Sequence, residues 1–222
     1  MKELRPNAKR GRIAVGVIWV IILLGIVSLI IEGIQLLIAS EIISVEDIGG
    51  NLLFILDSVL SYTTSLIFVA TIASIVTFIL WFRRAYYNIG LKTGKMRYGD
   101  GWAAGAWFIP ILNLFVPYRI MKELYEKTDQ YLVVNSREPY TERLKTDYVN
   151  GWWTLWIIRF FTSYISFKIE WGPLSTSDGN PFFSVLDSII GITLGIVTII
   201  VIEDYSKAER LLVETEDNAI DQ

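Results

Sequence analysis

The sequence predicts an all-α integral membrane protein built as a four-span helical bundle. Hydrophobic residues make up 53% of the 222 residues and charged residues only 19%, which is below the roughly 25% that a soluble domain carries on its surface. The mean hydropathy of +0.45 agrees with this composition. Two further elements complete the expected fold: a proline-broken re-entrant or interfacial segment and a cytoplasmic amphipathic helix. We expect residues 1–222 to form a single integral membrane domain.

Four apolar runs are long enough to cross a bilayer, whose hydrocarbon core requires about 20 helical residues. They are residues 13–39, 59–82, 150–167 and 183–202. The first run is too long for a signal peptide, whose apolar region is roughly 7–15 residues and ends in a small-x-small cleavage site. We therefore interpret it as a span that stays in the protein.

A fifth apolar run, residues 102–118, contains Pro110 in its middle and Pro117 near its end. Proline removes a helix hydrogen bond and clashes with the preceding turn. With four spans, 18 of the 20 Lys and Arg residues lie on one side, whereas a fifth span would divide them 11 to 8. The positive-inside rule thus favours four spans with both termini in the cytoplasm. The run then forms a hairpin, re-entrant or interfacial, that the two prolines shape; a fifth span is the alternative.

The remaining segments are predicted to lie outside the spans. Residues 119–134 carry apolar side chains at helical spacing between charged ones, which indicates an amphipathic helix on the cytoplasmic face. Residues 203–222 hold seven carboxylates against two basic residues, and we expect this acidic tail to fray from a helix into solvent. The outer loops, 40–58 and 168–181, are too short to form a sizeable outer domain.

The absence of His and Cys removes several classes of site. A Ser-His or Cys-His nucleophilic pair, a zinc site of imidazole or thiolate ligands, and a disulfide all require these residues. No cytoplasmic Asp or Glu cluster has metal-ligand spacing, so we predict no catalytic residue, metal or cofactor. No segment has the basic, aromatic-interleaved pattern of a nucleic-acid binder. An enzyme is therefore the weakest functional interpretation.

Charged residues inside spans are energetically costly and are often functional. Arg159 lies about ten residues into the third span, and Glu32 lies toward the outer end of the first. A Glu32–Arg159 pair would join residues that differ in depth by several positions. Gly191 and Gly195 form a G-x-x-x-G element, which permits close helix packing. Arg159 is the strongest single candidate for a functional or partner-binding charge.

Three stretches carry a more specific pattern: WFRRAYYN from Trp81 to Asn88, WFIPILNLFVPY from Trp107 to Tyr118, and MKEL from Met121 to Leu124. They resemble a bacterial membrane family, the domain-of-unknown-function family 4328. Its pattern reads W-x-x-R-A-x-x-N, then W-F-x-P-x-x-N-L-x-x-P-Y, then a helix with a glutamate. The likeness is specific over residues 78–125. Ala106 departs from it, because the family more often has a second aromatic residue there. The resemblance implies the architecture and transfers no activity.

Five polar residues of these stretches are predicted to form a structural network, a small-ligand or ion site, or contacts to a partner chain. They are Arg84, Asn88, Asn113, Tyr118 and Glu123. Arg84 complements the carbonyls at a helix C-terminus, and the Asn and Tyr side chains supply donors and acceptors for a broken backbone. Glu123 is placed to pair with Arg84.

The sequence therefore favours a multi-pass protein of the bacterial inner membrane without catalytic activity. We expect a structural or regulatory component that acts with a partner. The alternative is a small channel or transporter-like ligand-binding protein, in which the re-entrant segment lines a path beside Arg159. Membrane lipids are expected contacts; the partner is left open between another protein and a second copy of this chain.

Overall fold

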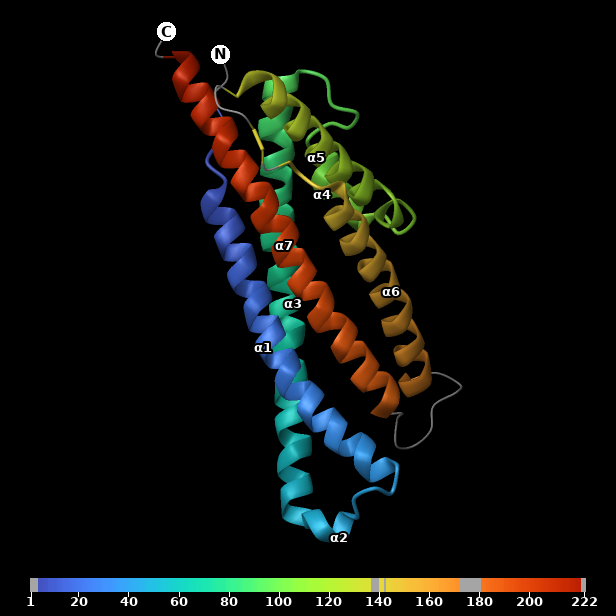
Figure 1. Cartoon of the computed structure of the whole chain (residues 1–222). Coiled ribbons are helices and arrows are strands. Elements are labelled where there is room, and N and C mark those ends of the chain that lie inside the picture. The colour runs from blue at the N-terminus through green and yellow to red at the C-terminus, as the bar shows by residue number, and fades with distance from the viewer. Residues whose placement is uncertain (1–3, 137–139, 142, 172–180, 221–222) are drawn as a thin grey trace. The chain divides into compact units, whose positions relative to one another are not determined.

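The computed structural model describes residues 4–136, 140–141, 143–171 and 181–220, and every regular element among them is a helix (Figure 1). The α-helices are α1 (Ala8–Ala39), α2 (Val45–Ile48), α3 (Gly50–Thr93), α4 (Trp102–Gly105), α5 (Val116–Asn135), α6 (Thr146–Trp171) and α7 (Pro181–Ile220). Two single-turn 3-10 helices, η1 (Ala106–Phe108) and η2 (Leu112–Leu114), lie between α4 and α5. The predicted all-α class is thereby confirmed.

Three of these helices, α1, α3 and α7, are long and apolar enough to cross a membrane. They contain the predicted spans 13–39, 59–82 and 183–202. Helix α6 contains the remaining predicted span, but Arg159 and several hydroxyl side chains interrupt its apolar sequence, so it does not join this group. The helices thus support a multi-pass membrane protein, and the crossing of α6 stays a prediction.

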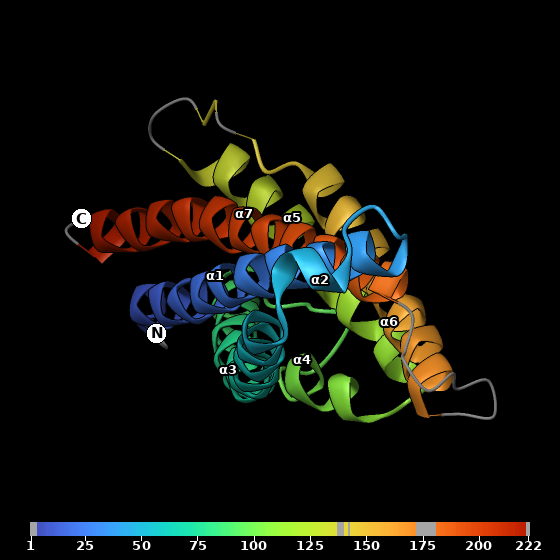
Figure 2. The ribbon, with the colours of Figure 1, turned by 90° about the horizontal axis from the view of Figure 1, so that it is seen from below.

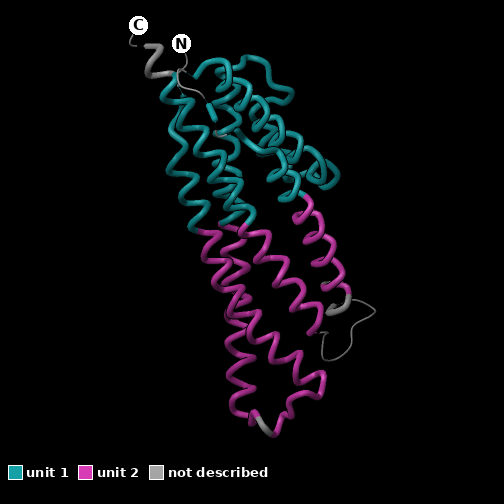
Figure 3. Tube along the Cα trace, viewed as in Figure 1, with its two compact units in different colours: residues 1–16, 74–153, 197–222 teal, residues 17–73, 154–196 magenta. Residues whose placement is uncertain are grey.

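The chain forms two compact units (Figure 3). Unit 1 consists of residues 1–16, 74–153 and 197–222, and unit 2 consists of residues 17–73 and 154–196. The boundaries fall inside α1, α3, α6 and α7, so each of these helices contributes one end to each unit. Helices α4, η1, η2 and α5 belong wholly to unit 1.

The core of unit 1 is built from large side chains on three helices. Helix α3 contributes Trp81, Phe82 and Tyr86, α5 contributes Ile120, Met121, Leu124, Tyr125 and Leu132, and α7 contributes Ile202, Tyr205 and Leu212. The buried positions of α5 recur every three or four residues, which explains the amphipathic pattern predicted over 119–134. The helix begins slightly earlier, at Val116, with Pro117 in its first turn, where a missing N–H is tolerated.

Helix α7 continues through most of the predicted acidic tail and ends at Ile220. The helix does not end near residue 203, because Tyr205, Ala208 and Leu212 return to the same face and are buried in unit 1. Packing of one face is what usually stabilises a helix of weak intrinsic propensity. Among the acidic side chains described there, Glu203 and Glu214 are exposed, whereas Glu209 is buried.

The segment 102–118 is broken into short turns, as its prolines led us to expect. Helices α4, η1 and η2 are each a single turn, and Pro110 lies in the gap between η1 and η2. Figure 2 shows the green segment that begins with α4 between α3 and α6. The predicted outer loop 168–181 lies largely outside the described residues.

Candidate functional site

The family-like stretch from Trp81 to Asn88 forms the last turns of α3 in unit 1. Trp81, Ala85 and Asn88 are spaced by four and three residues, so they lie on one helix face, and all three are buried. Arg84 lies on a different face and is partly exposed. The spacing W-x-x-x-A-x-x-N therefore places a polar carboxamide on an otherwise apolar face, where it needs hydrogen-bond partners.

Asn88 finds those partners on two other elements. Its Nδ2 donates to Glu209 Oε1 of α7 at 2.9 Å and to the Arg5 carbonyl at 2.9 Å, and its Oδ1 accepts from the Arg5 N–H at 3.1 Å. Asn7 Nδ2 donates to Glu209 Oε2 at 2.9 Å and to Oε1 at 3.2 Å. We call these four residues, Arg5, Asn7, Asn88 and Glu209, the carboxamide clamp. It joins the N-terminal segment, α3 and α7.

The Glu209 carboxylate is the acidic group of the clamp, and it is buried. Its residue is 6% exposed and Asn88 is 1% exposed. A buried carboxylate is tolerated only when it is hydrogen-bonded, and here two carboxamides supply the donors. Arg84 is the cation whose charge acts on Glu209. The Arg5 guanidinium instead lies over the Tyr87 ring, 4.3 Å from its centroid.

Glu123 has a separate set of partners. The Tyr86 hydroxyl donates to Glu123 Oε2 at 2.6 Å, and the Arg97 backbone N–H donates to Oε1 at 2.7 Å. The Tyr98 N–H donates to the Tyr86 hydroxyl at 3.1 Å. Glu123 thus fixes the connection after α3 against α5. The predicted pair with Arg84 is not formed, because the Glu123 oxygens already accept from Tyr86 and Arg97.

Tyr118 and Asn113 occupy a third location. The Tyr118 hydroxyl donates to Asn150 Oδ1 of α6 at 2.9 Å, and its ring stacks on Trp153 at 6.0 Å between centroids. The Asn113 backbone N–H donates to the Ile109 carbonyl at 2.9 Å. Its side-chain oxygen is buried without a partner among the described residues. The five predicted polar residues are therefore distributed over separate contacts within unit 1 and do not converge on one site.

Aromatic rings hold the hairpin segment against the helices. The Trp107 ring on η1 contacts Phe78 of α3 at 5.8 Å and Trp152 and Trp153 of α6 at 6.4 and 6.3 Å between centroids. Tilted and edge-on ring pairs at these separations add about 0.5–1.5 kcal/mol each beyond area burial. The rings of Trp107, Trp152 and Trp153 thus form part of the packing of unit 1.

Two hydroxyl contacts join α5 to α7. The Tyr125 hydroxyl donates to the Val201 carbonyl at 2.8 Å, and the Thr128 and Tyr205 hydroxyls lie 3.2 Å apart. Burial raises the pKa of the Tyr125 hydroxyl well above its usual value of 10, with the Asp204 carboxylate acting in the same direction. Tyr125 therefore remains a protonated donor at neutral pH.

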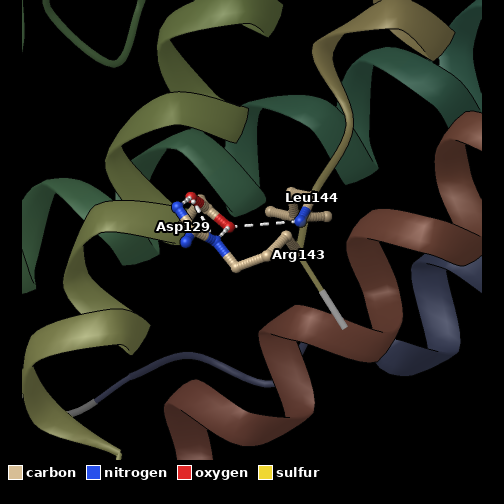
Figure 4. A network of polar contacts seen from close by, with 3 residues as sticks. All are labelled: Asp129, Arg143 and Leu144. Atoms are coloured by element: carbon tan, nitrogen blue, oxygen red, sulfur yellow. Dashed lines mark hydrogen bonds and ion pairs between the residues drawn. The ribbon is translucent and has the colours of Figure 1, made fainter. Parts of the chain in front are cut away.

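Asp129 on α5 binds the segment that leads into α6 (Figure 4). Arg143 donates from Nε to Asp129 Oδ1 at 2.8 Å and from Nη2 to Oδ2 at 2.5 Å, and the Leu144 N–H donates to Oδ1 at 3.2 Å. These bonds raise the pKa of the Arg143 guanidinium above its usual value. The planar guanidinium of arginine presents two N–H donors side by side, which match the two oxygens of a carboxylate; a lysine could not replace it in this arrangement.

Arg159 lies in unit 2 and is paired with Asp187 of α7. Its Nη2 is 3.0 Å from Asp187 Oδ2, Nη1 donates to the Asp187 carbonyl, and Ser163 Oγ donates to Asp187 Oδ1 at 3.0 Å. The partner that the structure shows for Arg159 is Asp187, and the predicted Glu32–Arg159 pair stays a prediction. A Cβ on Gly191 would lie 3.0 Å from the guanidinium Cζ, so the glycine provides the space for this side chain.

Gly195 allows α1 and α7 to approach closely within unit 2. A Cβ there would lie 2.9 Å from Ile22 Cγ1 and 3.5 Å from Ile18 Cγ2. Gly25 on α1 plays the reciprocal part, since its Cβ would lie 3.2 Å from Ile192 Cγ1. The G-x-x-x-G element therefore has two roles: Gly191 accommodates Arg159, and Gly195 packs against α1.

The chemistry available at these positions is limited. The described residues include no group of three Asp or Glu side chains placed to hold a metal ion. Three carboxylates accept hydrogen bonds from donors of the same chain: those of Glu209, Glu123 and Asp187. The arrangement can cross-link helices. Arg159 and Asp187 form a charged pair that retains partial solvent exposure, at 31% and 25% of the side chain.

Several important residues were not predicted as members of a site. Asn7, Asp129 and Glu209 lie in sequences that resemble ordinary polar surface. Asn7 lies within the N-terminal basic stretch and Glu209 within the acidic tail, and both stretches are typical of solvent-exposed sequence. A signal existed for Glu209, because it falls among Tyr205, Ala208 and Leu212, on the face that the apolar spacing predicts to be buried.

Comparison with known proteins adds one finding. The family model described as "Domain of unknown function (DUF4328)" matches residues 49–207, which includes all three family-like stretches, Arg159 and Asp187. Three of the four members of the carboxamide clamp, Arg5, Asn7 and Glu209, lie outside the matched range. No curated protein and no solved structure matches the chain.

Proposed function

The chain belongs to the family described as "Domain of unknown function (DUF4328)", and from this premise and its own contacts we propose a non-catalytic, structural or regulatory component of the bacterial inner membrane that acts with a partner. Four helices cross the bilayer, α6 included, with both termini and residues 83–148 in the cytoplasm. The support is the positive-inside distribution together with three helices of sufficient length and apolarity.

One observation carries the non-catalytic assignment. Two carboxylates that a catalytic site could use are engaged with donors of the same chain: Glu209 with Asn7 and Asn88, and Glu123 with Tyr86. Catalytic acids and bases need to reach a substrate proton within hydrogen-bond distance. Side chains that already cross-link helices serve the fold, and this favours a scaffold.

The partner is proposed to bind the exposed stripe of α5. Arg119, Glu126, Gln130 and Val133 recur at helical spacing on the face opposite the buried one and are exposed. Lys122 and Glu126 form the stripe's ion pair, at 4.0 Å. Such an exposed pair adds little to stability, so its residues are free to change without unfolding the chain.

The test is purification from the native membrane into lipid nanodiscs, with mass spectrometry of every co-purifying protein and lipid. The variant Glu126→Arg/Gln130→Arg should lose a stoichiometric protein partner while keeping its thermal stability. Lys95→Glu, an exposed change outside α5, is the matched control and should retain the partner. Absence of any stoichiometric protein partner from the unmodified chain would overturn the proposal.

A second function is favoured by the Arg159–Asp187 pair. Charged side chains in a predicted span commonly mark ion or substrate paths, and this pair is partly exposed. A channel or transporter-like protein would lose flux or ligand binding on Arg159→Leu while still assembling. Recovery of a single tightly held solute or lipid, without a protein partner, would favour this alternative.

A further inference from the structure

The turn around Pro110 presents a cluster of large apolar side chains at the surface of unit 1. Phe108 is 73% exposed, Ile109 42%, Ile111 74% and Phe115 55%. We call these four residues the apolar tip. Contiguous exposed apolar side chains of this size mark contact with lipid or with another protein.

The opposite side of the same segment is buried, so the exposure is one-sided. Ala103 and Ala106 are fully buried, and the Trp107 ring packs on Phe78, Trp152 and Trp153. Ala103, Ala106 and Trp107 thus anchor the segment, and the apolar tip faces outward. Neighbouring residues Trp107 and Phe108 therefore face opposite environments.

The contact with Phe78 fixes the level of the tip along α3. Phe78 lies five residues before Arg83, which at 1.5 Å per residue is about 7–8 Å along the helix axis. The exposed residues of α3 on the near side of Arg83 are apolar, namely Ile75, Val76 and Leu80. The tip adjoins Trp107, so it lies close to the level at which α3 itself changes from apolar to basic.

The chemistry of the segment fits the same level. No charged residue occurs from Trp102 to Tyr118, and Asp100 and Arg119 bracket the segment. Its backbone groups are paired locally: the Asn113 N–H donates to the Ile109 carbonyl at 2.9 Å and the Phe115 N–H to the Leu112 carbonyl at 3.1 Å. Local pairing is what a non-helical backbone requires at the edge of the hydrocarbon region.

We propose that the apolar tip inserts shallowly among the acyl chains of the cytoplasmic leaflet, as an interfacial wedge that does not cross the bilayer. The proposal rests on the proposed crossing of α3. It commits the exposed surface of Phe108, Ile109, Ile111 and Phe115 to lipid. The interfacial arrangement is chosen over a re-entrant one because Phe78, whose ring contacts Trp107 beside the tip, lies about one and a half helical turns before Arg83.

The test uses single cysteines, for which the natural chain is already suited because it has none. Ile111→Cys carries a nitroxide spin label in purified protein reconstituted into nanodiscs of mixed neutral and anionic phospholipid. Power saturation compares collisions with molecular oxygen, which concentrates in lipid, and with a water-soluble nickel chelate. Phe68→Cys, on the apolar part of α3, is the bilayer control, and Val134→Cys, 80% exposed on α5, is the aqueous control.

The expected oxygen-to-nickel ratio at Ile111 lies between those of the two controls, several-fold above that at Val134 and below that at Phe68. A ratio equal to that at Val134 overturns the proposal, as does low collision with both reagents, which means that protein covers the tip. A ratio equal to that at Phe68 overturns the shallow placement in favour of deep insertion.

The controls separate this proposal from the proposed function. An aqueous ratio at Phe68 shows that α3 does not cross, and both then fail together. A lipid ratio at Phe68 with an aqueous ratio at Ile111 removes the wedge alone. Phe108→Cys provides a second position, in case labelling at Ile111 disturbs folding. Partner binding is measured separately, so its loss or retention does not alter the reading of the spin labels.

Discussion

At the scale of the residue, Asn88 and Asn113 show how the same side chain in one sequence pattern serves different ends. Asn88 makes three hydrogen bonds to the N-terminal segment and α7. The side-chain oxygen of Asn113 is instead buried without a hydrogen-bond partner among the described residues. The two carboxamides should therefore differ sharply in their contribution to stability.

We predict that Asn88→Ala lowers the free energy of unfolding by roughly 2–4 kcal/mol, because it removes a donor to the buried Glu209 carboxylate and leaves the Arg5 backbone groups unpaired. Asn113→Ala is the matched control and should cost less than about 1 kcal/mol. The measurement is the midpoint of thermal unfolding in detergent, with intrinsic tryptophan fluorescence as the signal. Equal losses in the two variants would contradict this account of the clamp.

Sequence reasoning identified Asn88 but could not supply its partners. A polar residue on the apolar face of Trp81 and Ala85 must be satisfied, and that much follows from spacing alone. Asn7 and Glu209, however, are separated by 202 positions, and nothing local in either stretch indicates the other. The predicted pair of Glu123 with Arg84 was wrong for a related reason. The Glu123 carboxylate instead accepts hydrogen bonds from the Tyr86 hydroxyl and the Arg97 backbone N–H.

At the scale of the element, Asp129 holds the segment between α5 and α6 by binding both a side chain and a backbone N–H. We predict that Asp129→Asn accelerates trypsin cleavage after Lys145 by about tenfold, since local opening then costs one fewer charged contact. Asp147→Asn, an exposed acid in the first turn of α6, is the control. An unchanged cleavage rate in Asp129→Asn would show that other contacts hold this segment.

Close helix packing in unit 2 gives a second prediction at this scale. Gly195→Ala should destabilise the protein by about 1–3 kcal/mol through overpacking against Ile22. Gly33→Ala, where the added Cβ meets nothing within 4 Å, should be neutral or stabilising. The double variant Gly195→Ala/Ile22→Ala should cost less than the sum of its single changes, and strict additivity in thermal unfolding would argue against direct contact.

The elements themselves were largely predictable, and their limits were not. Apolar runs located α1, α3 and α7, and the spacing of Ile120, Leu124, Thr128 and Leu132 located α5. The length of α7 was underestimated because charge was given more weight than the buried face of Tyr205 and Leu212. Pro110 correctly indicated a broken segment, since proline acts on the backbone wherever it lies.

At the scale of the whole molecule, the topology yields a direct prediction. Single cysteines at Thr141 and Glu214 should react with a membrane-impermeant maleimide only after the cytoplasmic side is opened, and one at Ser44 should react in intact cells. The basis is the positive-inside distribution. Reaction at Thr141 and Glu214 in intact cells would indicate five crossings, because a crossing by 102–118 moves both residues to the other side.

Composition determined the class of molecule more firmly than any motif did. A chain with 19% charged residues and no His or Cys leaves few alternatives to a helical membrane protein without thiol or imidazole chemistry. The same composition does not reveal binding partners, because a surface that contacts lipid and a surface that contacts protein consist of the same apolar residue types. Arg159 shows this limit: its depth was predicted, but its pairing with Asp187 depended on the space at Gly191.

The carboxamide clamp also has a consequence for how the chain is made. Ribosomes synthesise Arg5 and Asn7 first among its members and Glu209 last, after most of α7 has been made. During synthesis, the polar groups of the N-terminal segment therefore remain hydrated until the helices that precede Glu209 have been inserted. Closure of the clamp requires Glu209, so a chain arrested before that residue exposes Asn7 and Asn88 and is distinguishable, by that exposure, from one that contains it.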